Sequence, residues 1–293
     1  MQYIFHLGVH GTAPAALAPY LTAHVHALRA QKVYFVNAEA PEALDAMQTA
    51  LTGRYLGTSD APQDAWFHEA NHAVADAARD AGARSVLVLS PDMLGPSLPR
   101  ALSLGRIGPG LYDAAPEMLR LATLGLPAKR VQCVLVPEDT ETLLLNLYSD
   151  GVRQGLTALR LDAFCDAIDL DHFSTGHLLA RLRDAHPRHR ITDRPDPGLR
   201  AGVGPFLRGV LDDLGLDPGA FPVEKPDLPA RLDAFQIEAL LHITDNGQSR
   251  NASRVAQLRD RVLCFAPDPA QPLHLPDWVS AVLSDSDETE AVA

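Results

Sequence analysis

The sequence begins MQYIFHLGVHGTAPAALAPY, residues 1–20, and this stretch decides the fold that we expect for the chain. Residues 3–7 form a short apolar run with two aromatic side chains, which is typical of a buried strand. Gly8 and Gly11 follow this run, and Thr12 is in position to cap a helix. The pattern predicts a strand, a glycine loop and a helix N-terminus. Backbone N–H groups and the helix dipole converge at such a loop, so it is a natural site for an anion.

Short apolar runs alternate with helical segments along the rest of the chain. They are rich in β-branched residues, as expected of strands that are buried on both faces of a parallel sheet. The runs lie at residues 32–36, 85–89 and 131–136, and a shorter candidate lies at 190–193. This alternation predicts an α/β fold in which a parallel sheet is flanked by helices and ligands bind at the carboxyl ends of the strands.

The order of these segments also predicts how the chain is divided. We expect an α/β core over residues 1–220 and a helical C-terminal extension, packed on that core, over residues 221–283. The last residues, 284–293, are polar and acidic, and we expect them to form a flexible tail.

Composition narrows the classes of function. The formal net charge of −12 argues against non-specific binding of nucleic acid, which depends on Lys and Arg to neutralise phosphates. No apolar run is long enough to cross a bilayer, so we expect no membrane partner. Three widely spaced cysteines, Cys133, Cys165 and Cys264, match no metal or disulfide pattern. No Lys or Arg occurs before Arg29, which argues against an export signal. We therefore expect a cytoplasmic protein.

The first loop carries a resemblance to a known family. The run His6-Leu7-Gly8-Val9-His10-Gly11-Thr12 resembles the phosphosulfate loop of bacterial sulfotransferases, which reads roughly His-x-Gly-x-His-Lys-Thr-Gly-Thr-Thr. These proteins have a P-loop-type α/β fold and take a sulfuryl group from 3′-phosphoadenosine 5′-phosphosulfate. The resemblance implies that Gly8, Gly11 and Thr12 contact this cofactor. It makes His10 an anion contact and a candidate catalytic base, and we expect His6 to belong to the core.

The loop departs from the family pattern at the charged position. Gly11 stands where the family has its phosphate-neutralising lysine, and residues 13–15 replace the family's glycine and two hydroxyl residues. Backbone amides and a dipole supply only part of the charge compensation that a phosphate needs. We therefore expect any cofactor affinity to be much weaker than in the family.

A second segment resembles the family's site for the 3′-phosphate. In the family an arginine at a strand end and a serine eight residues later, in a helix, hold this phosphate. The matching positions place Asn146 at the serine and keep Tyr148, so the resemblance implies that both contact the cofactor. Glu138 stands where the arginine belongs, and its carboxylate would repel a phosphate.

Asp92 is a candidate catalytic residue. It lies in Ser90-Pro91-Asp92, directly after the predicted strand 85–89, where the family often has a Ser-x-Glu-like element near the substrate. A carboxylate within hydrogen-bond reach of an acceptor hydroxyl can take its proton. The alternative is that Asp92 only caps the following turn.

The run His68-Glu69-Ala70-Asn71-His72 matches the His-Glu-x-x-His pattern of zinc peptidases. On a helix the two histidines would share a face and could bind zinc, with Glu69 activating a bound water. Ala75 and Ala78 occupy two positions of the longer signature, so its third ligand is missing. The alternative is a solvated helix face, and we expect no metal.

Three hypotheses follow. The first is a sulfotransferase-like enzyme that transfers a sulfuryl group to a hydroxyl of a small molecule or glycan. The second is a non-catalytic descendant that binds another ligand or a protein partner, and the third is a metal-dependent hydrolase built on His68, Glu69 and His72. Convergence of Arg106, Arg153 or Arg188 on the glycine loop would favour the first hypothesis over the second.

Overall fold

We describe the protein from a computed structural model. It describes residues 1–7, 14–103, 112–137, 139–170, 173–193, 203–221, 232–247 and 252–290. The chain forms two compact units, each assembled from separate stretches of sequence. Unit 1 contains residues 1–96, 112–138 and 176–228, and unit 2 contains residues 97–111, 139–175 and 229–293.

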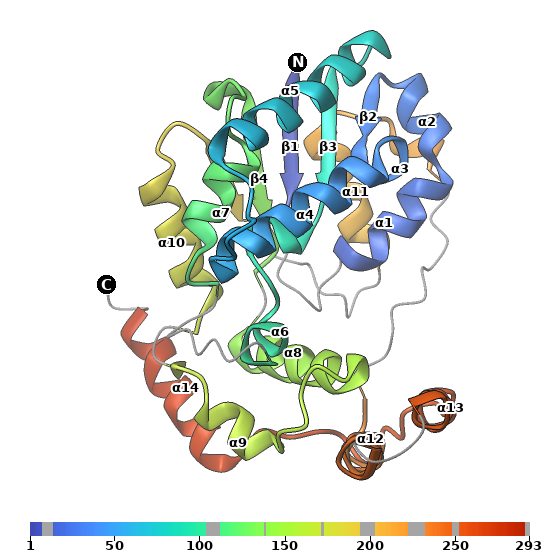
Figure 1. Cartoon of the computed structure of the whole chain (residues 1–293), viewed down its shortest axis with the longest axis vertical. Coiled ribbons are helices and arrows are strands. Elements are labelled where there is room, and N and C mark those ends of the chain that lie inside the picture. The colour runs from blue at the N-terminus through green and yellow to red at the C-terminus, as the bar shows by residue number, and fades with distance from the viewer. Residues whose placement is uncertain are drawn as a thin grey trace. The chain divides into compact units, whose positions relative to one another are not determined.

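A five-stranded parallel sheet forms the centre of unit 1 (Figure 1). The strand order is β2-β3-β1-β4-β5. The strands are β1 (Gln2–His6), β2 (Val33–Phe35), β3 (Ser85–Leu89), β4 (Val131–Leu135) and β5 (Arg190–Asp193). The sheet confirms the expected α/β fold with a parallel sheet flanked by helices.

The helices of unit 1 lie between these strands in sequence, except for α11, which follows the last strand. They are α1 (Pro14–Ala23), α2 (Val25–Ala30), α3 (Val36–Glu39), α4 (Pro41–Leu56), α5 (Asp64–Asp80), α7 (Ala115–Ala122), α10 (Thr175–Ala185, of which Thr175 belongs to unit 2) and α11 (Val203–Leu214). Short 3₁₀ turns are η1 (Pro91–Leu94), η2 (Ala128–Arg130) and η5 (Pro218–Ala220).

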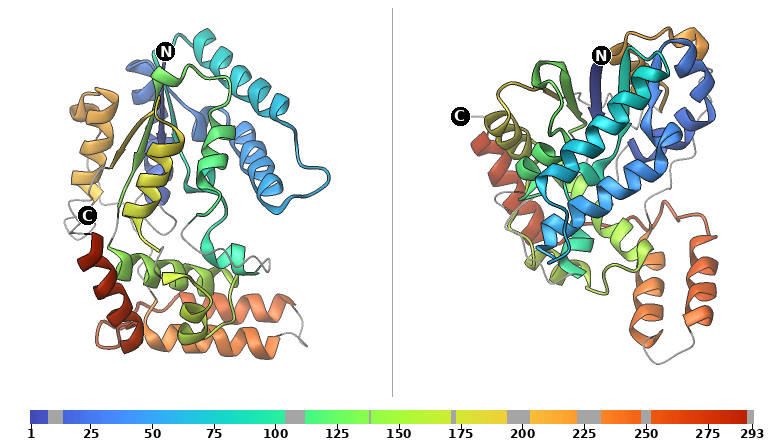
Figure 2. Two further views of the ribbon diagram at one scale, coloured as in Figure 1. Left: turned by 90° about the vertical axis from the view of Figure 1, so that its left-hand side faces the viewer. Right: turned by 45° about the horizontal axis from the view of Figure 1, so that its top comes forward.

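Side chains of the strands point alternately to the two faces of the sheet, and helices cover both faces. Ile4, Phe35 and Leu87 belong to one buried apolar cluster, together with residues of α1 and α11. Phe5 and Val88 are also buried, and they lie beside α4, α5 and α7. Figure 2 (left) shows α11 on one side of the sheet and α4 and α5 on the other. Burial on both faces explains why the strands read as continuous apolar runs.

Unit 2 consists mainly of helices. They are α6 (Leu98–Ser103), α8 (Thr140–Gln154), α9 (Leu161–Asp166), α12 (Ala234–Gly247), α13 (Ala252–Leu263) and α14 (Asp277–Glu290). The long helix α8 begins at the N-cap Asp139, whose carboxylate accepts a hydrogen bond from the Thr142 N–H at 2.8 Å. It ends at Gly155, which adopts the left-handed conformation at φ 73°.

Polar contacts join α8, α12 and α13 within unit 2. Asp233 and Gln236 form a reciprocal capping box at the start of α12: Asp233 accepts from the Gln236 N–H at 2.7 Å, and the Gln236 side chain accepts from the Asp233 N–H at 3.2 Å. The guanidinium of Arg259, in α13, donates to the carbonyls of Val152 and Arg153 at 2.6 and 2.9 Å. These carbonyls end α8, so Arg259 supplies a cation to the negative end of that helix.

The division of the chain differs from the expected core and extension. Two internal stretches, 97–111 and 139–175, belong to the same unit as the C-terminal helices. The reason is packing: the apolar residues of α8 are buried with α12 and α14 as neighbours. The expected tail also differs, because α14 continues through residues 284–290, and only 291–293 lie outside the described residues. Val279 and Leu283 are buried, so α14 is already formed there. Adding residues to an existing helix costs less free energy than nucleating a new one.

Candidate functional site

The strand order creates a switch point at β1. The chain passes from β1 to β2 on one side of the sheet, and from β3 it crosses β1 to reach β4 on the other side. In open parallel sheets the crevice for a ligand lies at such a point, outside the carboxyl ends of the strands. The glycine loop begins there, one residue after Leu7. Gly8, His10, Gly11 and Thr12 themselves lie outside the described residues.

The end of β1 is held firmly between its neighbours. The carbonyl of His6 accepts from the Ser90 N–H at 3.1 Å, and the Leu7 N–H donates to the carbonyl of Val134 at 2.9 Å. His6 and Leu7 are both fully buried, which confirms that His6 belongs to the core. The loop therefore starts from a fixed backbone position, as a preorganised anion site requires.

Two amide side chains organise the neighbouring end of β3. Asn37 donates to the carbonyl of Leu89 at 2.8 Å and accepts from the Leu89 N–H at 3.0 Å, so its amide pairs with the strand as a peptide group would. Gln48 donates to the hydroxyl of the buried Ser90 at 2.7 Å. Sequence reasoning did not find either residue. For Asn37 the sequence offers one signal, because its amide side chain directly follows the strand 32–36, at the carboxyl ends of the strands where ligands bind.

Asp92 lies at this same edge. It belongs to the 3₁₀ turn η1, which follows β3, and its side chain is half-buried. Its carbonyl accepts from the Gly95 N–H at 3.1 Å, and Gly95 has a φ of 117°, a conformation that L side chains rarely adopt. The turn thus fixes Asp92 beyond the carboxyl end of the strand next to β1.

Asn146 and Tyr148 lie on α8, in unit 2. The Tyr148 hydroxyl donates to the carbonyl of Leu159 at 3.0 Å, and its ring lies 5.1 Å from the ring of Phe164. The side chain is buried, and burial raises the pKa of Tyr148. Its hydroxyl therefore serves an internal contact of unit 2. Asn146 is half-buried, and Glu138 lies outside the described residues.

The three arginines that could replace the missing lysine have separate locations. Arg188 directly precedes β5. It therefore lies at the amino ends of the parallel strands, whereas the glycine loop follows the carboxyl end of β1. Arg153 lies in unit 2, where it pairs with Asp150 at 2.9 Å. Arg106 lies outside the described residues.

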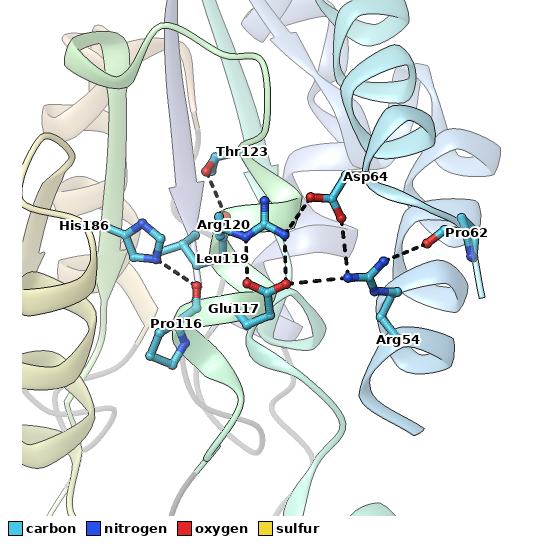
Figure 3. A network of polar contacts seen from close by, with 9 residues as sticks. All are labelled: Arg54, Pro62, Asp64, Pro116, Glu117, Leu119, Arg120, Thr123 and His186. Carbon is cyan, nitrogen blue, oxygen red and sulfur yellow. Dashed lines mark hydrogen bonds and ion pairs between the residues drawn. The ribbon is translucent and has the colours of Figure 1, made fainter. Parts of the chain in front are cut away.

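A four-residue ionic network joins α4, α5 and α7 (Figure 3). Arg120 contacts Glu117 at 2.6 Å and Asp64 at 2.9 Å, and Arg54 approaches the same two carboxylates at 3.7 and 3.4 Å. The hydrogen bond from Arg120 lowers the pKa of Glu117. Each guanidinium already faces two carboxylates, so the network ties helices together and offers little positive charge to an anionic ligand.

Two histidines form a second polar cluster. The Nε2 of the buried His186 lies 2.8 Å from the carbonyl of Pro116, which can only accept, so this nitrogen donates (Figure 3). The Nε2 of His189 lies 3.1 Å from the Thr123 hydroxyl, which donates its own proton to the carbonyl of Leu119. Burial, together with the neighbouring His186, lowers the pKa of His189. The pair ties the segment between α10 and β5 to α7.

His68 and His72 lie together on α5. Both are exposed, and their ring centroids are 4.4 Å apart. Asn71, between them in sequence, faces the interior and donates to the carbonyl of Leu124 at 3.0 Å. Within the described residues no group of three or more His, Cys, Asp or Glu side chains could hold a metal ion. The hydrolase hypothesis needs such a group, so it gains no support.

An apolar cavity of about 40 Å³ lies between the sheet and helices α4, α5 and α7. Phe5, Val86 and Val88 line it from the sheet, and Met47 and Asn71 line it from the helices. It is small beside a cavity of ~150 Å³ that admits benzene. It therefore represents a gap in packing that could be filled by a few methyl groups.

Comparison with protein-family models, with curated proteins and with solved structures gave no match. Among the helices of the described residues, none combines the length and the apolar character needed to cross a membrane.

Proposed function

We propose that this chain is a sulfotransferase-like protein that binds 3′-phosphoadenosine 5′-phosphosulfate beyond the carboxyl end of β1. The strand order β2-β3-β1-β4-β5 carries the proposal. It puts the strand that leads into the glycine loop at the switch point of the sheet, where α/β proteins bind their ligands. The run from His6 to Thr12 supplies the resemblance to the family's phosphosulfate loop.

The proposed reaction transfers a sulfuryl group to a hydroxyl of a small molecule or glycan. The acceptor oxygen forms a bond to sulfur, and the bond between sulfur and the bridging phosphate oxygen breaks. The leaving group is 3′-phosphoadenosine 5′-phosphate. The hydroxyl proton passes to a base, for which Asp92 and His10 are the candidates. Backbone N–H groups of residues 8–12 would stabilise the charge that develops on the leaving phosphate.

One observation favours a second candidate, a non-catalytic protein of the same fold that binds another ligand or a partner. Gly11 stands where the family has a lysine. Arg188 cannot supply this missing positive charge, because it lies at the amino ends of the strands and the loop follows the carboxyl end of β1. Without a cation at the loop, a doubly charged phosphate is held by dipoles alone. This candidate predicts weak donor binding or none.

Calorimetric titration with 3′-phosphoadenosine 5′-phosphate at low and moderate salt separates the two candidates. The first predicts binding that weakens with salt, and that also weakens in Thr12→Ala and in Gly8→Trp, which would fill the loop. Thr22→Ala is the matched control, because Thr22 lies on α1 and its hydroxyl donates to the carbonyl of Ala18 within the same helix. No heat and no thermal shift at millimolar ligand would rule out the first candidate.

The role of Asp92 needs a separate test. Asp92→Asn should keep the affinity for 3′-phosphoadenosine 5′-phosphate, because the carboxylate is proposed to face the acceptor. If transfer is detected in the natural protein, the variant should lower its rate by ~10²-fold or more. An unchanged rate in Asp92→Asn would leave His10 as the base.

A further inference from the structure

We infer that His68 and His72 form a two-histidine chelate for a late divalent transition-metal ion, with Cu²⁺ bound most tightly. The inference is independent of the proposed function. It concerns the exposed face of α5 and needs no catalysis by Glu69. It also departs from the expectation, drawn from the sequence, that the protein binds no metal.

The first step is the geometry of the pair. The two residues are one helical turn apart, and both side chains are exposed on the same face of α5. Their ring centroids lie 4.4 Å apart, with 37° between the ring planes. Imidazoles four residues apart on a helix can each direct one nitrogen to the same ion. The backbone of α5 thus already holds the two rings next to each other.

The second step is the availability of the ring nitrogens. Within the described residues neither ring takes part in a hydrogen bond or an ion pair. The contrast with His186 and His189 is direct, because the Nε2 of each of those rings is bonded to a backbone or hydroxyl oxygen. A metal ion at His68 and His72 would therefore displace only water.

The third step is the position of the His68 ring. A Cβ atom at Gly125 would lie 2.5 Å from the Cδ2 and 3.0 Å from the Nε2 of His68, so this side of the ring packs against the glycine and Nδ1 is the nitrogen assigned to the ion. Gly125 also has a φ of 83°, which favours glycine. Because the contact restricts the ring, His68 loses little conformational freedom when it binds an ion.

The fourth step is the choice of ion. Neutral imidazole nitrogens suit Cu²⁺, Ni²⁺ and Zn²⁺ and not Mg²⁺ or Ca²⁺, and affinity among divalent ions is highest for Cu²⁺. The net charge of −12 attracts cations to the protein. With two protein ligands, water fills the other coordination positions, so binding is exchangeable and not structural.

The test is calorimetric titration of the untagged full chain with Cu²⁺ and, separately, Zn²⁺. Every protein carries Cys264→Ser, because Cys264 is exposed and a free thiol would react with Cu²⁺. We expect one tight ion per chain, with affinity that falls as the pH is lowered because protons compete for the rings. His72→Ala and His68→Ala should each weaken Cu²⁺ binding at least about tenfold.

Two further variants make the test specific. His26→Ala removes an exposed histidine of another helix and should leave the affinity unchanged. Gly125→Ala should weaken binding by displacing the His68 ring while keeping both ligands. Electron paramagnetic resonance of the Cu²⁺ complex should reveal two imidazole nitrogens, and one in His72→Ala. A Cu²⁺ affinity in His68→Ala or His72→Ala equal to that of the parent protein, which carries only Cys264→Ser, would overturn the inference. A spectrum of the parent protein with fewer than two imidazole nitrogens would also overturn it.

Discussion

The sheet of unit 1 and helix α13 of unit 2 are stabilised in different ways. In unit 1 the sheet is buried on both faces, and a continuous apolar cluster runs through the strands and through α1 and α11. In unit 2 helix α13 has no buried side chain among its described residues, and Arg259 and Gln236 bond it to its neighbours. Apolar burial is spread over many contacts, whereas these polar links are few and directional. Substitutions should therefore act globally in the sheet of unit 1 and locally around α13.

The largest effect is expected in the apolar core of unit 1. Leu87→Ala removes a fully buried side chain from the middle of β3 and leaves a cavity. We expect a loss of about 3 kcal/mol in the free energy of unfolding, measured by urea denaturation. Leu159→Ala, at a side chain that is 40% exposed, is the control and should cost far less. A similar loss in both variants would contradict the contrast between core and surface.

The next effect is expected at the capping box of unit 2. Asp233→Ala removes the carboxylate that accepts from the N–H groups of Gln236 and Asp268 at 2.7 and 2.6 Å. We expect a loss of roughly 2 kcal/mol, because a buried cap is removed and two donors lose their partner. Hydrogen exchange should accelerate in α12 and α13 and stay unchanged in β1 and β3. Asp260→Ala, at an exposed acid of α13, is the control.

A smaller effect is expected at Arg259. Arg259→Lys keeps the positive charge but loses the planar fork that reaches the end of α8 and the Thr244 hydroxyl together. We expect a loss of about 1 kcal/mol and faster hydrogen exchange at residues 155–157. The matched variant is Arg261→Lys, which changes an exposed arginine of the same helix. Equal exchange in the two variants would mean that Arg259 does not hold α8.

A pH-dependent loss is expected at His189, in unit 1. The pKa of His189 is lowered in the folded state, so the unfolded chain binds more protons than the folded one below about pH 6.5. Its contribution to stability is complete above that pH and is lost as the pH falls toward the folded-state pKa. His189→Gln should reduce the difference in stability between pH 7.5 and pH 5.5. An unchanged difference in His189→Gln would contradict this role of His189.

The smallest effect is expected at the surface network. Arg120→Ala removes contacts to Glu117 and Asp64, but these side chains are 38 to 49% exposed and solvent screens them. We expect less than about 1 kcal/mol at low salt and a smaller loss at high salt. A loss of stability larger than about 1 kcal/mol that does not change with salt would contradict this prediction. It would show that the network stabilises the fold as strongly as apolar burial does in the core.

The strands of unit 1 could be predicted from sequence, but the contacts between segments could not. The runs at 32–36, 85–89 and 131–136 match β2, β3 and β4, because a strand buried on both faces must be apolar along its length. The candidate at 190–193 matches β5, of which only Ile191 is buried. The pairing of Asn37 with Leu89 spans 52 residues and leaves no periodic signal. The assembly of unit 2 from three stretches depends on the same kind of distant contact.

The candidate site was predicted only in part. The end of β1, the burial of His6 and the position of Asp92 beyond β3 follow from the order of strands. The contact between Gln48, on α4, and Ser90, after β3, does not, because it joins segments 42 residues apart and leaves no local pattern. The roles assigned to Gly8, Gly11, Thr12 and Asn146 stay predictions.

The central position of β1 in the sheet also determines the order in which its strands can pair. β1 ends at residue 6, but its two neighbours begin only at residues 85 and 131. During synthesis the edge of β1 that faces β3 stays unpaired until residues 85–89 have left the ribosome, and the edge that faces β4 stays unpaired until residues 131–135 have done so. Such distant pairing slows folding, and unpaired strand edges invite aggregation. A nascent chain that stalls before β4 is therefore the form of this protein most in need of a chaperone.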